Sequence, residues 1–168
     1  MATTTMVSPQ VVSNPAENLK LQLSRVIRAS RQRTFDAWTR PENMRQWFGP
    51  NRTIANLEIN PREDGAYLIE LEGGPCDSTI AKADIAPNVV ISGRYIKVDP
   101  YDLLSFTWAS NLDPSEETLV TITFKDVAEG TEVTLTHERF ATELSRSRHE
   151  MGWTGAIDKL KTYAESNS

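Results

Sequence analysis

Residues 118–139 read TLVTITFKDVAEGTEVTLTHER, two runs in which apolar and polar side chains alternate on either side of Glu129-Gly130. Such alternation is the period of a half-buried strand, and a short turn containing glycine between two such runs indicates a β-hairpin. The run Leu103–Trp108 alternates in the same way. One face of these three strands is apolar and the other carries mostly Thr, Ser and Glu, which is typical of an antiparallel sheet covered on one side. The residues of the apolar face are Leu104, Phe106, Trp108, Val120, Ile122, Phe124, Val133, Leu135 and His137.

More strands are predicted upstream of this stretch. Leu19–Ile27 alternates leucine with polar residues, so it is predicted to be a half-buried first strand. The other upstream runs are bounded by turn residues, as strands of a meander usually are. They are Thr53–Asn60, Gly65–Leu71, Ile80–Asp84 and Val89–Val98.

Three helices complete the predicted order. Ser30 is a suitable N-cap for a helix over 31–40, and Pro41 can open a second short helix that runs through Trp47. A long C-terminal helix is predicted over 146–165, because apolar residues recur there at helical spacing. Its stripe is Trp153, Ile157, Leu160 and Ala164, and Gly152 and Gly155 beside it are explained if the helix approaches the sheet closely. The order predicts an α+β domain.

Length and composition narrow the class of protein. The 168 residues suit a single domain over 19–168, preceded by a flexible N-terminal extension over 1–18. The formal charge of −5 disfavours nucleic-acid binding. A single cysteine, Cys76, excludes an internal disulfide, and no stretch resembles a secretion signal or a membrane span. We therefore expect a cytoplasmic protein, a monomer or homodimer, without nucleic-acid or membrane partners.

Several spaced motifs occur in one order over about 19–164. Phe35-Asp36-Ala37-Trp38-Thr39-Arg40-Pro41-Glu42 is followed by Gln46-Trp47-Phe48-Gly49-Pro50 and Gly93-Arg94-Tyr95, and later by Gly130-Thr131-Glu132-Val133-Thr134-Leu135-Thr136-His137 and Gly152-Trp153-Thr154. This succession resembles the SRPBCC (START-related) superfamily, in the group similar to the C-terminal domain of the activator of the 90-kDa heat-shock protein ATPase. One departure is Asp64, at a position where relatives commonly carry glycine.

The resemblance implies a helix-grip fold, in which a curved antiparallel sheet wraps around a long C-terminal helix, with two short helices after the first strand. It also implies a cavity between helix and sheet for an apolar or amphipathic ligand, with the segment around Trp47 at the mouth. A heat-shock protein ATPase is the partner that the resemblance suggests.

Aromatic and histidine side chains are the candidates for a ligand site. His137 shares a strand face with Val133 and Leu135, and His149 precedes Trp153 by four residues on the helix stripe. For Trp47-Phe48, a lid over the cavity and plain core packing both remain open. The predicted ligand-binding residues are Trp47, Phe48, Tyr67, Tyr95, Trp108, His137, Phe140, His149 and Trp153.

Catalytic and metal chemistry have little support in the sequence. Two histidines without a carboxylate or thiolate at ligand spacing make a poor metal site, so we predict no metal and no cofactor. No Ser-His-Asp order, phosphate-binding loop or HExxH pattern occurs, and no catalytic residue is assigned. His137 can be read as a hydrogen-bonded wall residue or as a general base, and Arg25 as a structural ion-pair partner or as a ligand anchor.

Three functions follow from these observations. The leading hypothesis is non-enzymatic binding of a small hydrophobic molecule, or an amphipathic one, in an internal cavity. The first alternative is a co-chaperone-like module that contacts a heat-shock protein ATPase, which the resemblance implies. The second is a cyclase- or hydrolase-like enzyme of the same superfamily, for which convergent titratable groups would be needed in the cavity.

Overall fold

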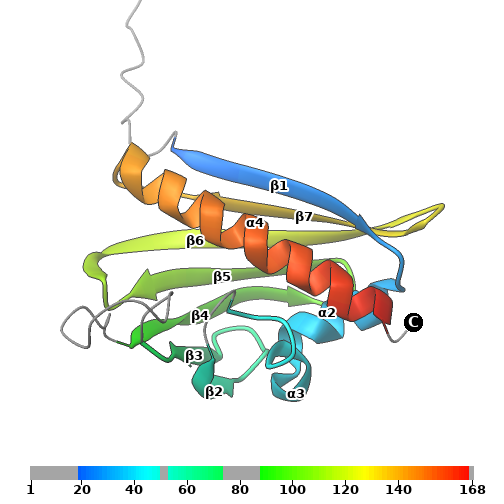
Figure 1. Cartoon of the computed structure of the whole chain (residues 1–168), viewed down its shortest axis with the longest axis horizontal. Coiled ribbons are helices and arrows are strands. Elements are labelled where there is room, and N and C mark those ends of the chain that lie inside the picture. The colour runs from blue at the N-terminus through cyan, green and yellow to red at the C-terminus, as the bar shows by residue number, and fades with distance from the viewer. Residues whose placement is uncertain (1–18, 50–52, 74–87, 167–168) are drawn as a thin grey trace, which may run out of the picture.

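One curved, unclosed sheet of seven antiparallel strands forms the body of the protein, and a long helix lies across one of its faces (Figure 1). The computed structural model describes residues 19–49, 53–73 and 88–166. The strand order across the sheet is β1-β7-β6-β5-β4-β3-β2. The strands are β1 (Lys20–Ile27), β2 (Ile54–Ile59), β3 (Ala66–Leu71), β4 (Val89–Asp99), β5 (Leu103–Ser110), β6 (Asp113–Val127) and β7 (Gly130–Glu138), and the helices are α2 (Arg31–Thr39), α3 (Pro41–Met44) and α4 (Glu143–Ser166).

The predicted meander is confirmed. β6 and β7 pair across the turn at Gly130 with Phe124 opposite Val133, so both apolar rows lie on one face. β1 closes the other side of β7 with Leu21 opposite His137, which brings the first and the last strand together. The apolar row forms a continuous core, with Val120, Ile122 and Leu135 fully buried. The strand predicted over 80–84 lies outside the described residues.

The two short helices follow β1 as predicted. Ser30 caps α2, since its hydroxyl oxygen accepts the Arg33 N–H at 3.1 Å. Pro41 opens α3, but the helix ends at Met44 rather than at Trp47. The chain continues in a turn in which the Phe48 N–H donates to the Met44 carbonyl at 2.9 Å, and Gly49 takes a positive φ of 84°. Trp47 lies in this turn and is buried.

The long helix α4 carries the predicted stripe, with Trp153, Ile157 and Leu160 buried against the sheet. It begins at Glu143 rather than at Arg146, because the Thr142 hydroxyl accepts the Ser145 N–H at 3.1 Å and acts as an N-terminal cap. Its backbone comes nearest to β1 and α2. Among the described residues, no helix is long and apolar enough to cross a bilayer.

Gly152 is not explained by close packing. A Cβ atom built on this residue would meet no heavy atom within 4 Å. The expectation that the helix approaches the sheet closely at this point is therefore wrong for Gly152, which faces open space instead.

The turn before β3 accommodates the departure at Asp64. Its φ is 64°, in the left-handed region that glycine enters freely and that aspartate tolerates better than most residues. The Asp64 N–H donates to the Tyr95 carbonyl at 2.8 Å, which ties this turn to β4. The substitution therefore leaves the local fold intact.

Candidate functional site: a cavity under the long helix

A cavity of about 550 Å³ lies between the N-terminal half of α4 and strands β3 to β6. This volume is within the usual range of small-molecule sites, about 300–1,000 Å³. Most of its wall is apolar, and two exposed leucines, Leu112 and Leu144, stand at its edge. The main apolar wall residues are Phe48, Leu71, Ile91, Trp108, Trp153 and Ala156.

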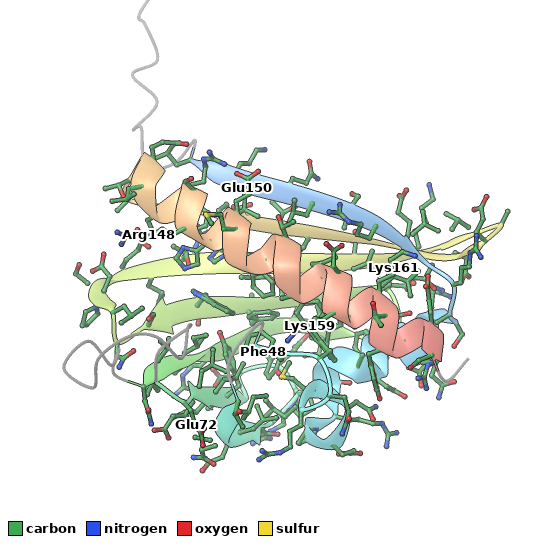
Figure 2. The ribbon with its side chains drawn as sticks, in the orientation of Figure 1. Phe48, Glu72, Arg148, Glu150, Lys159 and Lys161 are labelled. Carbon is green, nitrogen blue, oxygen red and sulfur yellow. The ribbon has the colours of Figure 1, made fainter. Side chains whose placement is uncertain are left out.

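Four of the predicted residues line this cavity: Phe48, Trp108, His149 and Trp153. They come from the turn after α3, from β5 and from α4, so only the folded chain brings them together. Figure 2 shows Phe48 near the middle of the sheet beneath α4. The indole rings of Trp108 and Trp153 lie with their centroids 5.1 Å apart and form one continuous apolar wall.

Tyr67 and Tyr95 lie deeper, around an inner space of about 10 Å³ that Phe48, Trp108 and Trp153 separate from the cavity. The Tyr67 hydroxyl donates to the Thr107 carbonyl at 2.5 Å. Burial raises the pKa of Tyr67 well above its usual range, with smaller contributions from Tyr95 and Glu117, and burial also raises the pKa of Tyr95. Both phenols therefore stay protonated at neutral pH and serve as packed core residues.

His137 lies one layer behind the cavity wall and is completely buried. The Trp153 indole N–H donates to His137 Nδ1 at 3.0 Å. His137 Nε2 must then carry the proton and donate to the Thr118 hydroxyl at 2.6 Å, and that hydroxyl donates in turn to the Trp108 carbonyl at 3.1 Å. This chain of hydrogen bonds satisfies both ring nitrogens and links the three wall residues Trp153, Thr118 and Trp108.

The surroundings of His137 favour the neutral imidazole. Burial lowers its pKa well below the usual value, and the nearby His149 lowers the pKa further. Phe140, also completely buried, stacks against the His137 ring at 4.4 Å between centroids. His137 and Phe140 thus support the wall from behind, and neither one lines the cavity.

Trp47 is a core residue and does not stand at the mouth of the cavity. Its side chain is 1% exposed, and its indole N–H donates to the Ala37 carbonyl at 2.9 Å. Its ring packs edge-on against Trp38 at 4.6 Å between centroids. Of the two alternatives for Trp47-Phe48, the structure therefore places Trp47 in the packing and Phe48 in the cavity wall.

Charged groups stand at one end of the cavity. Glu116 accepts one hydrogen bond at each carboxylate oxygen, from the Ala141 N–H before α4 at 2.8 Å and from the Ser145 hydroxyl in the first turn of α4 at 2.6 Å. Arg148 lines the same end and is exposed. Figure 2 shows Arg148 on one side of α4 and Glu150 on the other.

Arg25 and Arg31 form ion pairs within the chain. Arg25 Nε lies 3.3 Å from Asp158 Oδ1 on α4, so Arg25 is a half-exposed structural partner rather than a ligand anchor. Arg31, at the start of α2, pairs with Asp102 in the turn between β4 and β5 and with Asp126 near the end of β6. Within the described ranges, no cluster of three or more His, Cys, Asp or Glu side chains is arranged to hold a metal ion.

The sequence profile of the activator of Hsp90 ATPase homolog 1-like proteins matches residues 28–165. The chain belongs to this family. Membership places it with the SRPBCC-type helix-grip proteins, as the spaced motifs predicted, and supports a ligand-binding or co-chaperone-type module in general. Among curated proteins, none matches the sequence.

Solved structures from three bacteria share the family's fold. A protein from Chromobacterium violaceum superposes with a TM-score of 0.73 at 22% identity, covering 87% of this chain and 97% of that one. One from Silicibacter pomeroyi has a TM-score of 0.71 at 20% identity, covering 85% and 95% of the two chains. One from Nitrosomonas europaea has a TM-score of 0.70 at 22% identity, covering 89% and 96%. At these identities the likeness shows the fold alone.

Sequence analysis of this family member missed one residue that lines the cavity, Arg148, and singled out another, Gly152. Arg148 looks like a surface arginine, although helical spacing separates it from Arg146. Arg146 has Glu143 three residues before it and Glu150 four residues after it, whereas Arg148 has no carboxylate at these spacings. Gly152 carried a usable signal, because a glycine in a helix interior costs about 1 kcal/mol relative to alanine and calls for an explanation. No contact in the structure requires glycine there, and the missing side chain leaves space unfilled beside the cavity.

Proposed function

We propose that this protein binds a small hydrophobic or amphipathic molecule in the cavity under α4 and does not transform it chemically. The observation that carries the proposal is a cavity of about 550 Å³ whose wall is built mainly from aromatic and aliphatic side chains. Removing apolar ligand surface from water is favourable by about 25 cal/mol per Å², so such a wall binds apolar molecules without specific chemistry.

The hydrogen bonds behind the wall support binding over catalysis. A general base needs a free lone pair within reach of the substrate. His137 has both nitrogens engaged by protein groups and lies behind the wall. Glu116 accepts the Ala141 N–H and the Ser145 hydroxyl, so its carboxylate ties β6 to the start of α4. These groups hold the cavity in shape.

Gly152 offers a direct test of the site. Gly152→Leu adds a side chain into open space next to the cavity, and the change from glycine improves helix propensity by up to about 1 kcal/mol, so the variant should fold. Ser147→Leu adds the same side chain at an exposed position of α4 that does not line the cavity, and it is the matched control. The probe is the uncharged fluorophore N-phenyl-1-naphthylamine.

Wild type and Ser147→Leu should bind the probe with enhanced fluorescence, and Gly152→Leu should bind it at least about tenfold more weakly, which corresponds to about 1.4 kcal/mol. Thermal unfolding of all three proteins checks that they fold. Equal binding by Gly152→Leu and wild type, or no binding by wild type, would refute the cavity as the site. Native mass spectrometry of protein purified from its own host then identifies a retained molecule.

Contact with a heat-shock protein ATPase is the second candidate function, and the family match over residues 28–165 favours it. Its test is the ATP hydrolysis rate of the purified 90-kDa heat-shock protein from the same host, with and without this protein. A cavity variant such as Gly152→Leu separates the two functions, because a docking surface outside the cavity would be unaffected by it.

A further inference from the structure

Arg148 is a charged side chain of the cavity wall that has no partner among the described residues. It lines the cavity from α4 and makes no ion pair or hydrogen bond with the described residues. The contrast with Arg146, two residues earlier, is direct. Arg146 pairs with Glu143 and lies 2.6 Å from Glu150 Oε2. One arginine on this part of α4 is therefore neutralised, and the other presents its charge at the cavity.

The two carboxylates of the same wall, Glu116 and Asp113, accept hydrogen bonds from groups other than Arg148. Glu116 holds the Ala141 N–H and the Ser145 hydroxyl, as described above. Asp113, at the exposed start of β6, accepts the Ser115 hydroxyl at 2.7 Å. Neither carboxylate forms an ion pair with Arg148. The guanidinium thus remains available to an oxyanion from outside the chain.

The other basic group of the wall is His149. Its Nδ1–H donates to the Ser145 carbonyl at 2.7 Å, and its ring packs against Phe140 at 5.0 Å between centroids. A guanidinium is always charged and presents several N–H donors. Arg148 is therefore the wall's donor suited to an anion.

We propose that the ligand is an amphipathic anion whose apolar body fills the cavity and whose oxyanion head group, a carboxylate or a phosphate or sulfate ester, pairs with Arg148. This proposal rests on the proposed function and names the class of ligand. A planar guanidinium matches two oxygens of such a head group through parallel hydrogen bonds. The apolar wall alone would accept a neutral molecule of the same shape, so Arg148 is the residue that selects for charge.

The test compares two probes with the same hydrocarbon chain, decanoate and 1-decanol, each displacing N-phenyl-1-naphthylamine. Decanoate is kept below its critical micelle concentration and 1-decanol below its solubility limit. Arg148→Gln removes the positive charge at the cavity. Lys159→Gln makes the same charge change on the exposed C-terminal half of α4, away from the cavity, and is the control (Figure 2). Circular dichroism checks that each variant folds.

Arg148→Gln should weaken decanoate binding by about three- to tenfold, the range between an exposed ion pair and a charge-assisted hydrogen bond. Its affinity for 1-decanol should change by less than about twofold, and Lys159→Gln should leave both affinities unchanged. If Arg148→Gln loses affinity equally for both probes, or loses no affinity for decanoate, the head-group assignment is overturned while the cavity proposal stays in place. Failure of wild type to bind either probe would refute the cavity proposal and the head-group assignment with it.

Discussion

Replacing His137 tests whether the buried hydrogen-bond chain holds the cavity wall. His137→Leu keeps an apolar side chain of similar size but leaves the buried Trp153 N–H without an acceptor and the Thr118 hydroxyl without a donor. An unsatisfied buried polar group costs about 1–3 kcal/mol, so the free energy of unfolding should fall by about 2–4 kcal/mol. His137→Gln can place an amide oxygen near Trp153 and an amide N–H near Thr118, so it should lose less than about 1.5 kcal/mol.

The pH dependence of stability gives a second readout of the same residue. Because burial and His149 lower the pKa of folded His137, the unfolded chain takes up a proton at a higher pH than the folded chain does. The stability from neutral His137 is complete above the unfolded pKa, about 6.5, and is lost as the pH falls below it. Between pH 7.5 and pH 5.5 this single group should lower the free energy of unfolding by about 1.4 kcal/mol.

The assay is urea unfolding followed by tryptophan fluorescence at pH 7.5, 6.5 and 5.5, for wild type and both variants. Subtracting the His137→Gln curve removes the contribution of the other titrating groups. If the difference in the free energy of unfolding between wild type and His137→Gln stays constant over this pH range, the buried, neutral state of His137 is refuted. A loss below about 0.5 kcal/mol for His137→Leu at pH 7.5 would show that the hydrogen-bond chain does not stabilise the wall.

Two further substitutions test the core and the sheet. Leu160→Ala removes a fully buried side chain of α4 and should lower the free energy of unfolding by about 2–5 kcal/mol in urea titrations; a loss below about 1 kcal/mol would contradict the packing of α4 on the sheet. Gly93→Ala would place a Cβ atom 2.0 Å from the Thr107 carbonyl oxygen, so β4 and β5 must move apart. The free energy of unfolding should therefore fall by about 1–3 kcal/mol, and an unchanged melting temperature would contradict this close approach.

The elements that depend on local physics were predictable. The alternation in β5, β6 and β7 follows from a sheet with one covered face, and the register that places Phe124 opposite Val133 keeps both apolar rows on that face. The N-cap at Ser30 and the helix start at Pro41 also depend only on neighbouring backbone groups. The end of α3 was not predictable in this way, because the turn after Met44 depends on Trp47 packing against Trp38 from another helix.

The sequence by itself therefore determined the strand and helix order, the apolar faces and, through spaced motifs, the family. Tertiary structure alone settled which aromatic residues line the cavity, since Trp47 and Phe48 are neighbours in the chain but one lies in the core and the other in the wall. It also settled the proton position on His137, because that depends on donors from α4 and β6 that are distant in sequence. Arg146 and Arg148 differ for a local reason, because Glu143 and Glu150 stand at helical spacing from Arg146, but only the tertiary structure shows that Arg148 lines the cavity.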